Sequence, residues 1–264
     1  MRFALSAFAS LAAALFLVGA ANAGCWSGRP QTVNIHAYSD DGIFTLEDGR
    51  ELLLSGLERP SSPAAIAAWR ETTALLIAHS VQLYAEKSHT EDRYGRFRAF
   101  VVTSDNLLQE RLVESGWARV HPIKGSHMCL AALMQAEAHA RAAGLGIWSD
   151  PAYRLLDAAD IKSLLALDGT YQIVSGQVLA VARKRGRLYL NFGRDWQSDF
   201  TVTVAPSDAR LFESPTFDGG DVPSANIVGK RVRVRGFLGR YNGPDMEIAS
   251  PDQIEILGDL GTSE

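Results

Sequence analysis

The sequence has few of the features that mark several classes of protein. Its two cysteines in 264 residues exclude a small disulfide-built fold and a cysteine-rich zinc module. It has no surplus of positive charge, because 26 lysines and arginines stand against 30 aspartates and glutamates. With a formal net charge of -4, the chain as a whole is not a polycation that coats nucleic acid. Its content of 47% hydrophobic and 21% charged residues is that of a folded globular protein.

Long apolar runs are confined to the first residues, which have the pattern of a secretory signal. Arg2 gives a positive start, Ala4–Ala20 is apolar apart from serines and one glycine, and Ala21-Asn22-Ala23 is a small-x-small cleavage site. A membrane anchor and a lipoprotein attached through Cys25 are the alternatives. The pattern favours cleavage after residue 23 and export to the periplasm or out of the cell. Later in the chain, no apolar run reaches the ~18 residues of a membrane span.

Export bears on the two cysteines, because an oxidising compartment favours disulfides. Cys25 and Cys129 lie outside the signal and have no metal-type spacing, so we expect them to form a disulfide. The loop that it closes is long, so the chain-entropy model gives a stabilisation on the order of 4 kcal/mol. The alternatives are two unpaired buried thiols and a catalytic cysteine near His121 and His127, which lacks a third orienting group.

Alternation of apolar and polar residues predicts strands in the first half of the chain, with helices between and after them. The predicted strands are Val33–Tyr38, Ile43–Leu46, Glu51–Leu57, Ser80–Glu86 and Phe97–Thr103, and the predicted helices are Ala64–His79, Asn106–Gly116 and Cys129–Ala143. Three strands, a helix, two strands and then helices are typical of a small closed barrel of the OB type with helical cover.

The second half is also rich in strands. They are predicted at Tyr171–Val181, Leu188–Phe192, Phe200–Val204, Arg231–Leu238, and Met246–Ile248 with Ile254–Ile256. A loop rich in Gly, Pro, Ser and Asp, Ser214–Ala225, interrupts them. We therefore expect a mainly β protein with helices, whose second domain is another small OB-like barrel. The expected boundaries are a signal peptide at 1–23, a first domain at 24–152, a connector at 153–168, the second domain at 169–258 and a tail at 259–264.

Several motifs of the first half follow one another in a recognisable order. They are Phe44–Arg50, Leu54–Pro60, Asp92–Arg96, Leu107–Val120, and Ala136–Arg141 with Gly144–Asp150. Together they resemble the thermonuclease, or staphylococcal nuclease-like, family over about residues 32–150. The resemblance implies an OB-fold barrel with helices. Active members of that family are calcium-dependent phosphodiesterases that cut DNA and RNA.

The resemblance also implies which residues carry the chemistry. Such a site needs a hard cation held by oxygen ligands, a carboxylate that activates water, and guanidinium groups that hold the phosphate. The arginine of the family's Tyr-Gly-Arg motif is Arg96, so Arg96 is the expected catalytic residue. The carboxylate before the family's x-Pro-Glu falls on Glu58, and Asp41 lies close to the first metal-ligand position. Glu58 and Asp41 are therefore the candidate calcium ligands.

Three other family positions carry residues that cannot do the same chemistry. The third-strand arginine falls on Leu53, the base glutamate on Ser61, and the first metal aspartate on Ile43. Loss of a phosphate-holding donor lowers the rate by about 10²–10³, and loss of a general base by a further ~10²–10⁴. We therefore expect a degenerate site that binds nucleic acid or another polyanion instead of cutting it efficiently. The alternatives are a secreted calcium-dependent phosphodiesterase and an envelope interaction protein without a nucleic-acid ligand.

The second half adds basic residues that are candidates for nucleic-acid binding. One group, in a turn between strands, is Arg183, Lys184, Arg185 and Arg187, and the other, on one face of a strand, is Arg231, Arg233 and Arg235. Tyr189, Phe192 and Tyr241 offer stacking surface nearby. The alternative is a solvated basic face balanced by the many acids around it. Anionic envelope polymers and lipid headgroups are other candidate partners.

Overall fold

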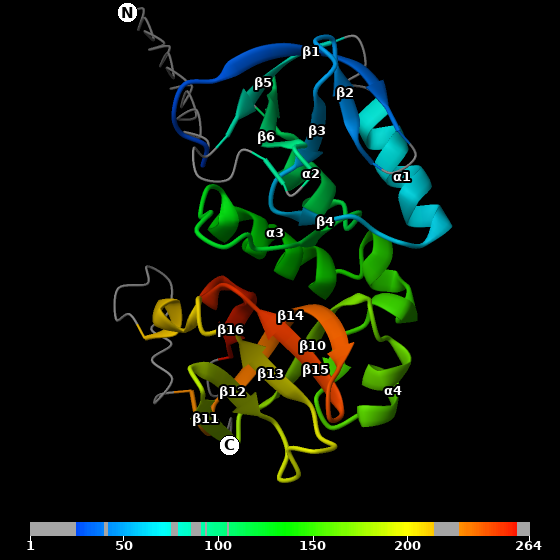
Figure 1. Ribbon diagram of the computed structural model, residues 1–264. Helices are drawn as coiled ribbons and strands as arrows, with labels where there is room; N and C mark the ends of the chain where they lie inside the picture. The colour runs from blue at the N-terminus through cyan, green and yellow to red at the C-terminus, as the bar shows by residue number, and fades with distance from the viewer. Residues whose placement is uncertain are drawn as a thin grey trace, which may run out of the picture.

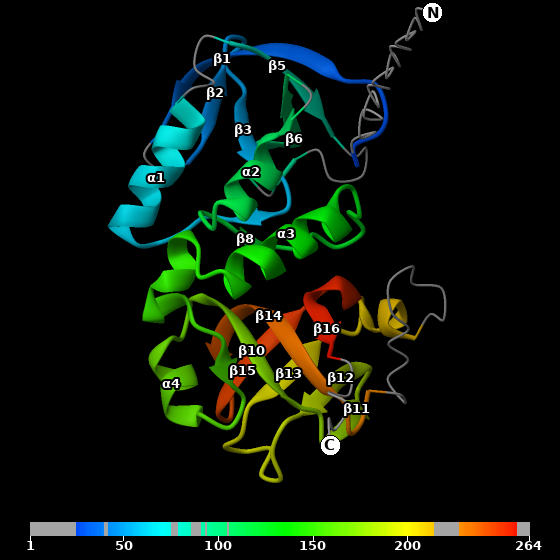
Figure 2. The same ribbon diagram turned by 180° about the vertical axis from the view of Figure 1, so that it is seen from behind.

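The computed structural model describes residues 25–39, 42–74, 79–85, 91–92, 94–104, 106–213 and 227–257. The predicted signal peptide, Asp41, the loop at 214–225 and the tail at 259–264 lie outside the described residues. Two β-rich lobes follow each other along the chain, and a layer of helices lies on the side of the first lobe that faces the second (Figures 1 and 2). Within the described residues, no helix is both long and apolar enough to cross a membrane.

Five strands of the first lobe close into a small barrel. They are β1 (Gln31–Tyr38), β2 (Phe44–Leu46), β3 (Glu51–Leu54), β5 (Ser80–Tyr84) and β6 (Phe97–Thr103). The second half of β1 pairs with β2 and its first half pairs with β5, so this strand takes part in both sides of the ring. The parallel pairing of β3 with β6 closes the ring. The predicted barrel of the OB type is confirmed.

The third predicted strand is divided in two. β3 ends at Leu54, and β4 (Leu57–Glu58) leaves the ring to pair with β8 (Arg119–Val120). Gly56 lies between them with φ +77°, a conformation that interrupts an extended strand. The turn carries the chain out of the barrel, towards the layer of helices.

Three helices cover the first barrel. They are α1 (Pro63–Ala74), α2 (Leu108–Glu114) and α3 (Leu130–Ala142), with β7 (Asn106–Leu107) before α2 and the 3-10 turns η1 (Gly146–Ser149) and η2 (Pro151–Tyr153) after α3. α1 begins at a proline, whose fixed φ suits the first helical turn. At Gly116 and Gly146 the backbones approach so closely that a Cβ on either would lie under 2.5 Å from the other segment. The two glycines therefore let η1 pack against the end of α2.

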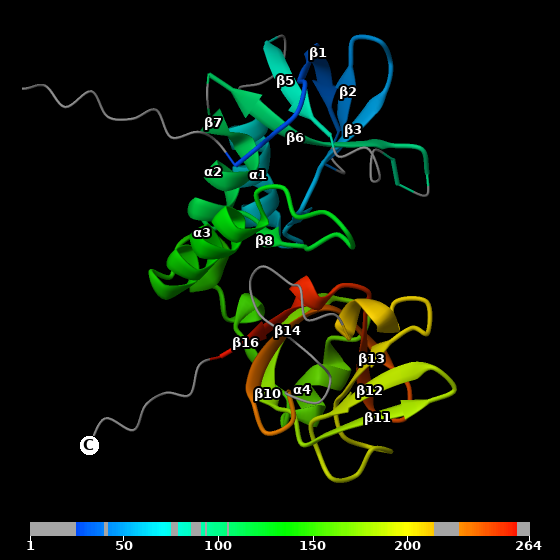
Figure 3. The same ribbon diagram turned by 90° about the vertical axis from the view of Figure 1, so that its left-hand side faces the viewer.

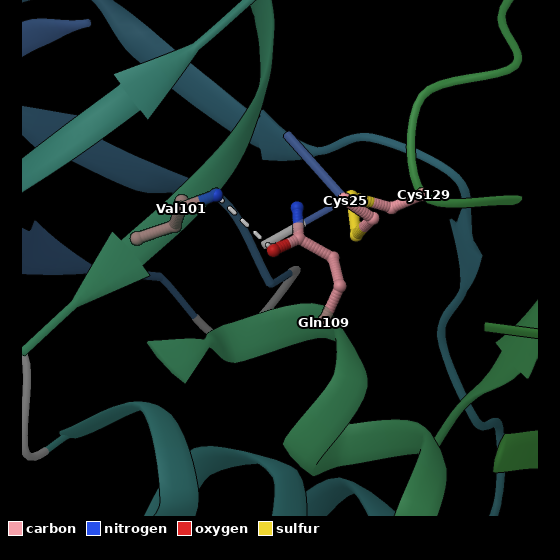
Figure 4. The surroundings of a disulfide bond; sticks show 4 residues. All are labelled: Cys25, Val101, Gln109 and Cys129. Atoms are coloured by element: carbon pink, nitrogen blue, oxygen red, sulfur yellow. Dashed lines mark hydrogen bonds between the residues drawn. A yellow bond between two sulfur atoms is a disulfide. The ribbon is translucent and has the colours of Figure 1, made fainter. Parts of the chain in front are cut away.

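The predicted disulfide between Cys25 and Cys129 is confirmed. It joins residues separated by 104 positions and ties the N-terminal segment to the residue that precedes α3 (Figure 4). Beside it, the buried side chain of Gln109 on α2 accepts a hydrogen bond from the backbone of Val101 and donates one to the backbone of Ala99. The glutamine thus attaches α2 to β6, while the disulfide attaches the N-terminal segment to the start of α3.

The second lobe repeats the ring of the first. Its strands are β10 (Tyr171–Gln177), β11 (Ala180–Lys184), β12 (Arg187–Asn191), β13 (Thr201–Val204), β14 (Arg231–Arg240) and β15 (Pro244–Ile248). β10 pairs with β14 while β11 pairs with β12, so the two consecutive strands act as one bent strand, as β1 does. β13 runs parallel to β15, and β15 pairs with β14, which completes the ring. The second OB-like barrel is therefore present as predicted.

Short elements complete the second lobe. They are β9 (Leu156–Asp157), α4 (Ile161–Ala166), η3 (Ala209–Phe212), η4 (Pro251–Gln253) and β16 (Ile254–Ile256). β9 pairs in parallel with β10, so part of the segment that we expected to be a connector belongs to the second sheet. Buried apolar residues from β10, β12, β13, β14 and β15 fill the interior of this barrel.

A buried ion pair joins the two lobes. Nη1 of Arg235 on β14 lies 2.8 Å from Oε2 of Glu137 on α3, and both side chains are 1% exposed. Glu137 also accepts a hydrogen bond from the backbone of Val120, and Arg235 donates one to the carbonyl of the same residue. Glu255 on β16 pairs with the other side of the guanidinium. Burial opposes charge, but the two carboxylates raise the pKa of Arg235 above its ordinary value.

Aromatic side chains surround this ion pair. The guanidinium of Arg119 on β8 lies 5.1 Å from the ring centroids of both Tyr153 and Tyr171. The ring of His121 packs against Tyr171 at 4.9 Å and against Phe237 at 5.9 Å. Figure 3 shows β8 and α3 of the first lobe facing β10, β14 and β16 of the second. Because charged and aromatic groups interlock across this boundary, the lobes pack in one defined orientation.

We predict that Arg235→Met destabilises the protein by ~3–5 kcal/mol, because the buried Glu137 then loses its nearest counter-charge and keeps only Arg141, at 3.4 Å. The free energy of unfolding in denaturant measures this loss. The matched control is Arg231→Met, an exposed residue of the same strand, with an expected effect within about 0.5 kcal/mol. Adding Glu137→Gln to Arg235→Met should recover part of the loss. Equal effects of Arg235→Met and Arg231→Met would contradict the prediction.

Candidate functional site

Arg96 lies in a tight turn before β6 and is held there by Asp92. Nε and Nη2 of Arg96 lie 2.8 and 2.6 Å from Oδ2 of Asp92. The other carboxylate oxygen accepts the backbone N–H groups of Tyr94 at 2.8 Å and of Arg96 at 3.0 Å. The guanidinium carbon of Arg96 lies 5.0 Å from the ring centroid of Tyr94, which is 66% exposed. One aspartate thus fixes both the turn and the direction of the arginine.

The hydrogen bonds to Asp92 stabilise its charged form. Burial alone would favour the neutral acid, but the donors of Arg96 and the amide of Tyr94 hold the pKa of Asp92 below its ordinary value. Only two groups of the Arg96 guanidinium point at Asp92. Since a guanidinium has five N–H donors, the others remain for a phosphate oxygen.

A second arginine lies on the outer face of the barrel, beside Leu53. Leu52 and Leu54 are buried in the interior, so Leu53 between them points outward. In the parallel pairing of β3 with β6, Leu53 lies opposite Arg98. Arg98 is therefore on the same face, two residues after Arg96, where the sequence analysis expected one guanidinium to be missing. The signal for it was the spacing of two between Arg96 and Arg98.

A third arginine stands at the start of β3. The guanidinium of Arg50 lies 5.3 Å from the ring centroid of Phe97 and 2.8 Å from Oδ2 of Asp48. Phe97 lies opposite the inward-facing Leu52, whereas Arg98 lies opposite the outward-facing Leu53, so the contact with Phe97 does not place Arg50 beside Arg98. We refer to Arg96, Arg98 and Tyr94 as the arginine edge.

Comparison with protein families agrees with this geometry. Residues 60–150 match the family described as staphylococcal nuclease homologue. The matched range contains Arg96, Arg98, the three helices α1, α2 and α3, and η1. It ends just before η2, which contains Tyr153. The first barrel is a staphylococcal nuclease-like domain. No curated protein matches the chain.

Ser61, which we expected at the family's base position, has a structural partner. The backbone N–H of Ser61 donates to the hydroxyl of Tyr153 at 2.9 Å, and that of Ser62 donates to it at 2.8 Å. Burial opposes ionisation of this hydroxyl, but the bonds from the two serines lower the pKa of Tyr153 overall. Tyr153 thus holds the segment in which the family has its base, and Ser61 supplies no carboxylate to activate water.

The candidate calcium ligands do not converge in the described part of the chain. Oε2 of Glu58 lies 3.2 Å from Nδ1 of His121, close to the boundary between the lobes. Ile43 offers no side-chain oxygen, and Asp41 lies outside the described residues. Among the described residues, no three His, Cys, Asp or Glu side chains form a group that suits a metal ion. The donors that are described therefore do not fit a calcium site.

The basic residues predicted in the second lobe do not form one surface. Alternation places Arg231, Arg233 and Arg235 on the outer face of β14, but this face is turned towards the first lobe. Arg235 is 1% exposed and bonded to Glu137, so its assignment to nucleic-acid binding was wrong. Arg233 pairs with Glu255 at 3.4 Å. The sequence pattern showed which residues share a face of β14, but it could not show that the first lobe packs against part of that face.

The basic turn of the second lobe is also largely paired with acids. Arg183 forms an ion pair with Glu213, and Arg187 forms one with Glu247. Arg185 lies in the turn between β11 and β12 with φ +51°. The remaining members, Lys184 on β11 and the exposed Arg231 on β14, lie on strands that do not pair with each other. A continuous basic surface is therefore not formed by the seven predicted residues.

We predict that Asp92→Asn destabilises the protein by on the order of 1 kcal/mol at neutral pH, a modest loss because the ion pair is near the surface. A carboxyl with a lowered folded-state pKa stabilises above its unfolded pKa of ~3.9 and loses this effect as pH falls through the folded pKa. The difference between Asp92→Asn and the unchanged protein should therefore shrink below about pH 4. Denaturant unfolding measured across that range tests this. A difference independent of pH would contradict the role given to the charge.

Proposed function

We propose that the protein is an exported nucleic-acid-binding protein whose nuclease-like barrel holds phosphodiester backbones without hydrolysing them efficiently. One observation carries the proposal. Arg96 keeps the position and the support that phosphate binding needs, whereas Ser61, in the place of the base, has no carboxylate and is engaged by Tyr153. On this proposal the site has kept a group that binds phosphate, Arg96, and has lost the carboxylate that would activate water.

The arginine edge suits single-stranded nucleic acid. Arg98 lies on the outer face of β6, opposite Leu53, and Arg96 lies two residues before it, in the turn that leads into this strand. Guanidinium groups hold phosphate oxygens through charge-assisted, often bidentate hydrogen bonds. The exposed ring of Tyr94 beside them offers a surface on which a base stacks. Bases are free to stack in this way only when they are unpaired, so we favour single strands over duplexes.

Export is the second part of the proposal. It rests on the signal-type pattern of residues 1–23 and on the disulfide between Cys25 and Cys129. Structural disulfides persist in oxidising compartments such as the periplasm and the exterior of the cell. Nucleic acid met there comes from lysed cells or from the surrounding medium.

We predict that the purified protein binds a single-stranded oligonucleotide with an affinity that falls as salt rises. Fluorescence anisotropy at several salt concentrations gives the slope of log affinity against log salt. Each phosphate contact to a single strand contributes about 0.7 to that slope, so Arg96→Ala with Arg98→Ala should lower it by roughly 1.4. Arg210→Ala, which removes an exposed arginine from the second lobe, is the control and should leave the slope nearly unchanged.

A digestion assay with calcium separates binding from catalysis. At protein concentrations that saturate binding of the oligonucleotide, we expect no cleavage by the unchanged protein beyond that seen with Arg96→Ala. Calcium-dependent cleavage that disappears in Arg96→Ala would instead establish the alternative, a phosphodiesterase with reactive groups outside the described residues. Absence of binding even at low salt would sink the proposal and leave an envelope interaction protein.

A further inference from the structure

The two barrels share one ring topology, but their corresponding outer faces carry different side chains. In the first barrel, the parallel pair β3 and β6 presents Leu53 next to Arg98. In the second barrel, the corresponding pair β13 and β15 places Thr201 opposite Asp245 and Thr203 opposite Glu247. This face carries an arginine in the first barrel, whereas in the second barrel it carries threonine hydroxyls and carboxylates. The second face is not a copy of a phosphate-binding surface.

A pocket of about 390 Å³ lies on this face of the second barrel. Its size falls within the ~300–1,000 Å³ of small-ligand sites. Its floor is formed by outward side chains of the strands, among them Tyr189, Asn191 and Thr201. Figure 1 places β11 and β12 at the end of the second lobe away from the first, so the pocket and the lobe boundary lie on different sides. The pocket therefore remains open when the lobes are packed together.

Two exposed aromatic side chains border the pocket. Trp196, in the loop between β12 and β13, is 58% exposed, and Tyr241, in the turn between β14 and β15, is 74% exposed. Large aromatic side chains gain stability from burial, so two of them exposed at one pocket indicate a surface kept for a ligand.

The loop that carries Trp196 is held in place by its own side chains. Asp195 accepts hydrogen bonds from the hydroxyl of Ser198 at 2.8 Å and from the backbone of Gln197 at 3.1 Å. Asp199 accepts the backbone N–H of Asp195 at 2.8 Å. The loop also touches the turn of Tyr241, because a Cβ on Gly243 would lie 2.7 Å from the backbone oxygen of Ser198. Both aromatic rings are therefore carried on segments that are ordered before a ligand arrives.

The charges at the pocket are balanced. Lys184 and Asp245 are the charged residues that line it, one of each sign. Just beside it, Arg187 is paired with Glu247 and lies 3.3 Å from the hydroxyl of Thr203. Burial and the neighbouring Glu247 raise the pKa of Asp245 although the backbone of Tyr241 donates to it. A polyanion needs several cations, and the residues that line the pocket supply only Lys184, which Asp245 balances.

We infer that this pocket binds a neutral oligosaccharide. The apolar faces of sugar rings stack on aromatic side chains such as Trp196 and Tyr241, as flat apolar surfaces do in general. Hydroxyl, amide and carboxyl groups such as those of Thr201, Asn191 and Asp245 exchange hydrogen bonds with sugar hydroxyls. Barrels of the OB type bind both oligonucleotides and oligosaccharides on this kind of face, and the absence of surplus positive charge decides for the neutral ligand.

Isothermal titration of the full-length mature protein with soluble tetrasaccharides tests the inference. The probes are the β-1,4-linked tetramers of N-acetylglucosamine and of glucose and the α-1,4-linked tetramer of glucose. We expect at least one to bind, with an affinity that changes little between about 0.05 and 0.3 M salt because no phosphate is neutralised. Trp196→Ala and Tyr241→Ala should each weaken that binding about tenfold or more.

Tyr94→Ala is the matched control, because Tyr94 is similarly exposed but belongs to the first barrel. It should leave saccharide binding unchanged and weaken binding of the oligonucleotide, whereas Trp196→Ala should do the reverse. Lack of binding by all three tetrasaccharides would overturn the inference. So would oligonucleotide binding that Trp196→Ala removes, which would assign the pocket to nucleic acid. Because the two ligands are measured on the same variants, failure of the saccharide site is distinguishable from failure of the arginine edge.

Discussion

The ion pair between Arg235 and Glu137 is the constraint on which the arrangement of the two barrels depends. A charge buried this deeply is tolerated only when its partner is correctly placed, so the pair excludes orientations in which either side chain meets apolar surface. Both groups also bond to the backbone of Val120, which brings β8 of the first lobe into the same contact. We therefore expect the pair to contribute more to the specificity of this arrangement than to net stability, because apolar residues of similar volume often stabilise as well as a buried ion pair does.

This alignment decides which surfaces remain for ligands. It buries Arg235 on the outer face of β14, and it leaves open the faces of β3 with β6 and of β13 with β15. The two open faces have the same place in their rings but opposite chemical character. Arginines and one tyrosine mark the first, whereas threonines, carboxylates and two exposed aromatic rings mark the second. The shared fold therefore determines where a ligand can bind, whereas the outward side chains determine which ligand it is.

Sequence reasoning predicted the barrels well because each strand alternates between inside and outside, and such alternation is local. It also placed Arg231, Arg233 and Arg235 on one face, since parity within a strand needs no knowledge of other elements. It failed at Arg235 because the partner, Glu137, lies almost 100 residues away in a helix whose polar residues looked solvent-exposed. Arg98 was missed for the same reason: only the pairing of β3 with β6 puts it beside Leu53. Contacts between distant segments decide both cases: the spacing of two from Arg96 points to Arg98, but only the strand pairing shows that it lies beside Leu53.

The contacts that attach the second barrel also engage the segments on which we expected the base and a metal ligand of the nuclease-like domain. Tyr153 binds the backbone of Ser61 through its hydroxyl and the guanidinium of Arg119 through its ring, and Arg119 lies in turn against Tyr171 of the second barrel. Glu58, which we expected to be a metal ligand, bonds to His121, whose ring also packs on Tyr171. Both segments that would supply a base and a cation ligand are thus built into the lobe boundary. Arg96, which is fixed by its own turn, is independent of that boundary and keeps its place. A carboxylate introduced at residue 61 would stand in a segment whose backbone is held by Tyr153, so its direction would depend on the lobe boundary as well as on the residue itself.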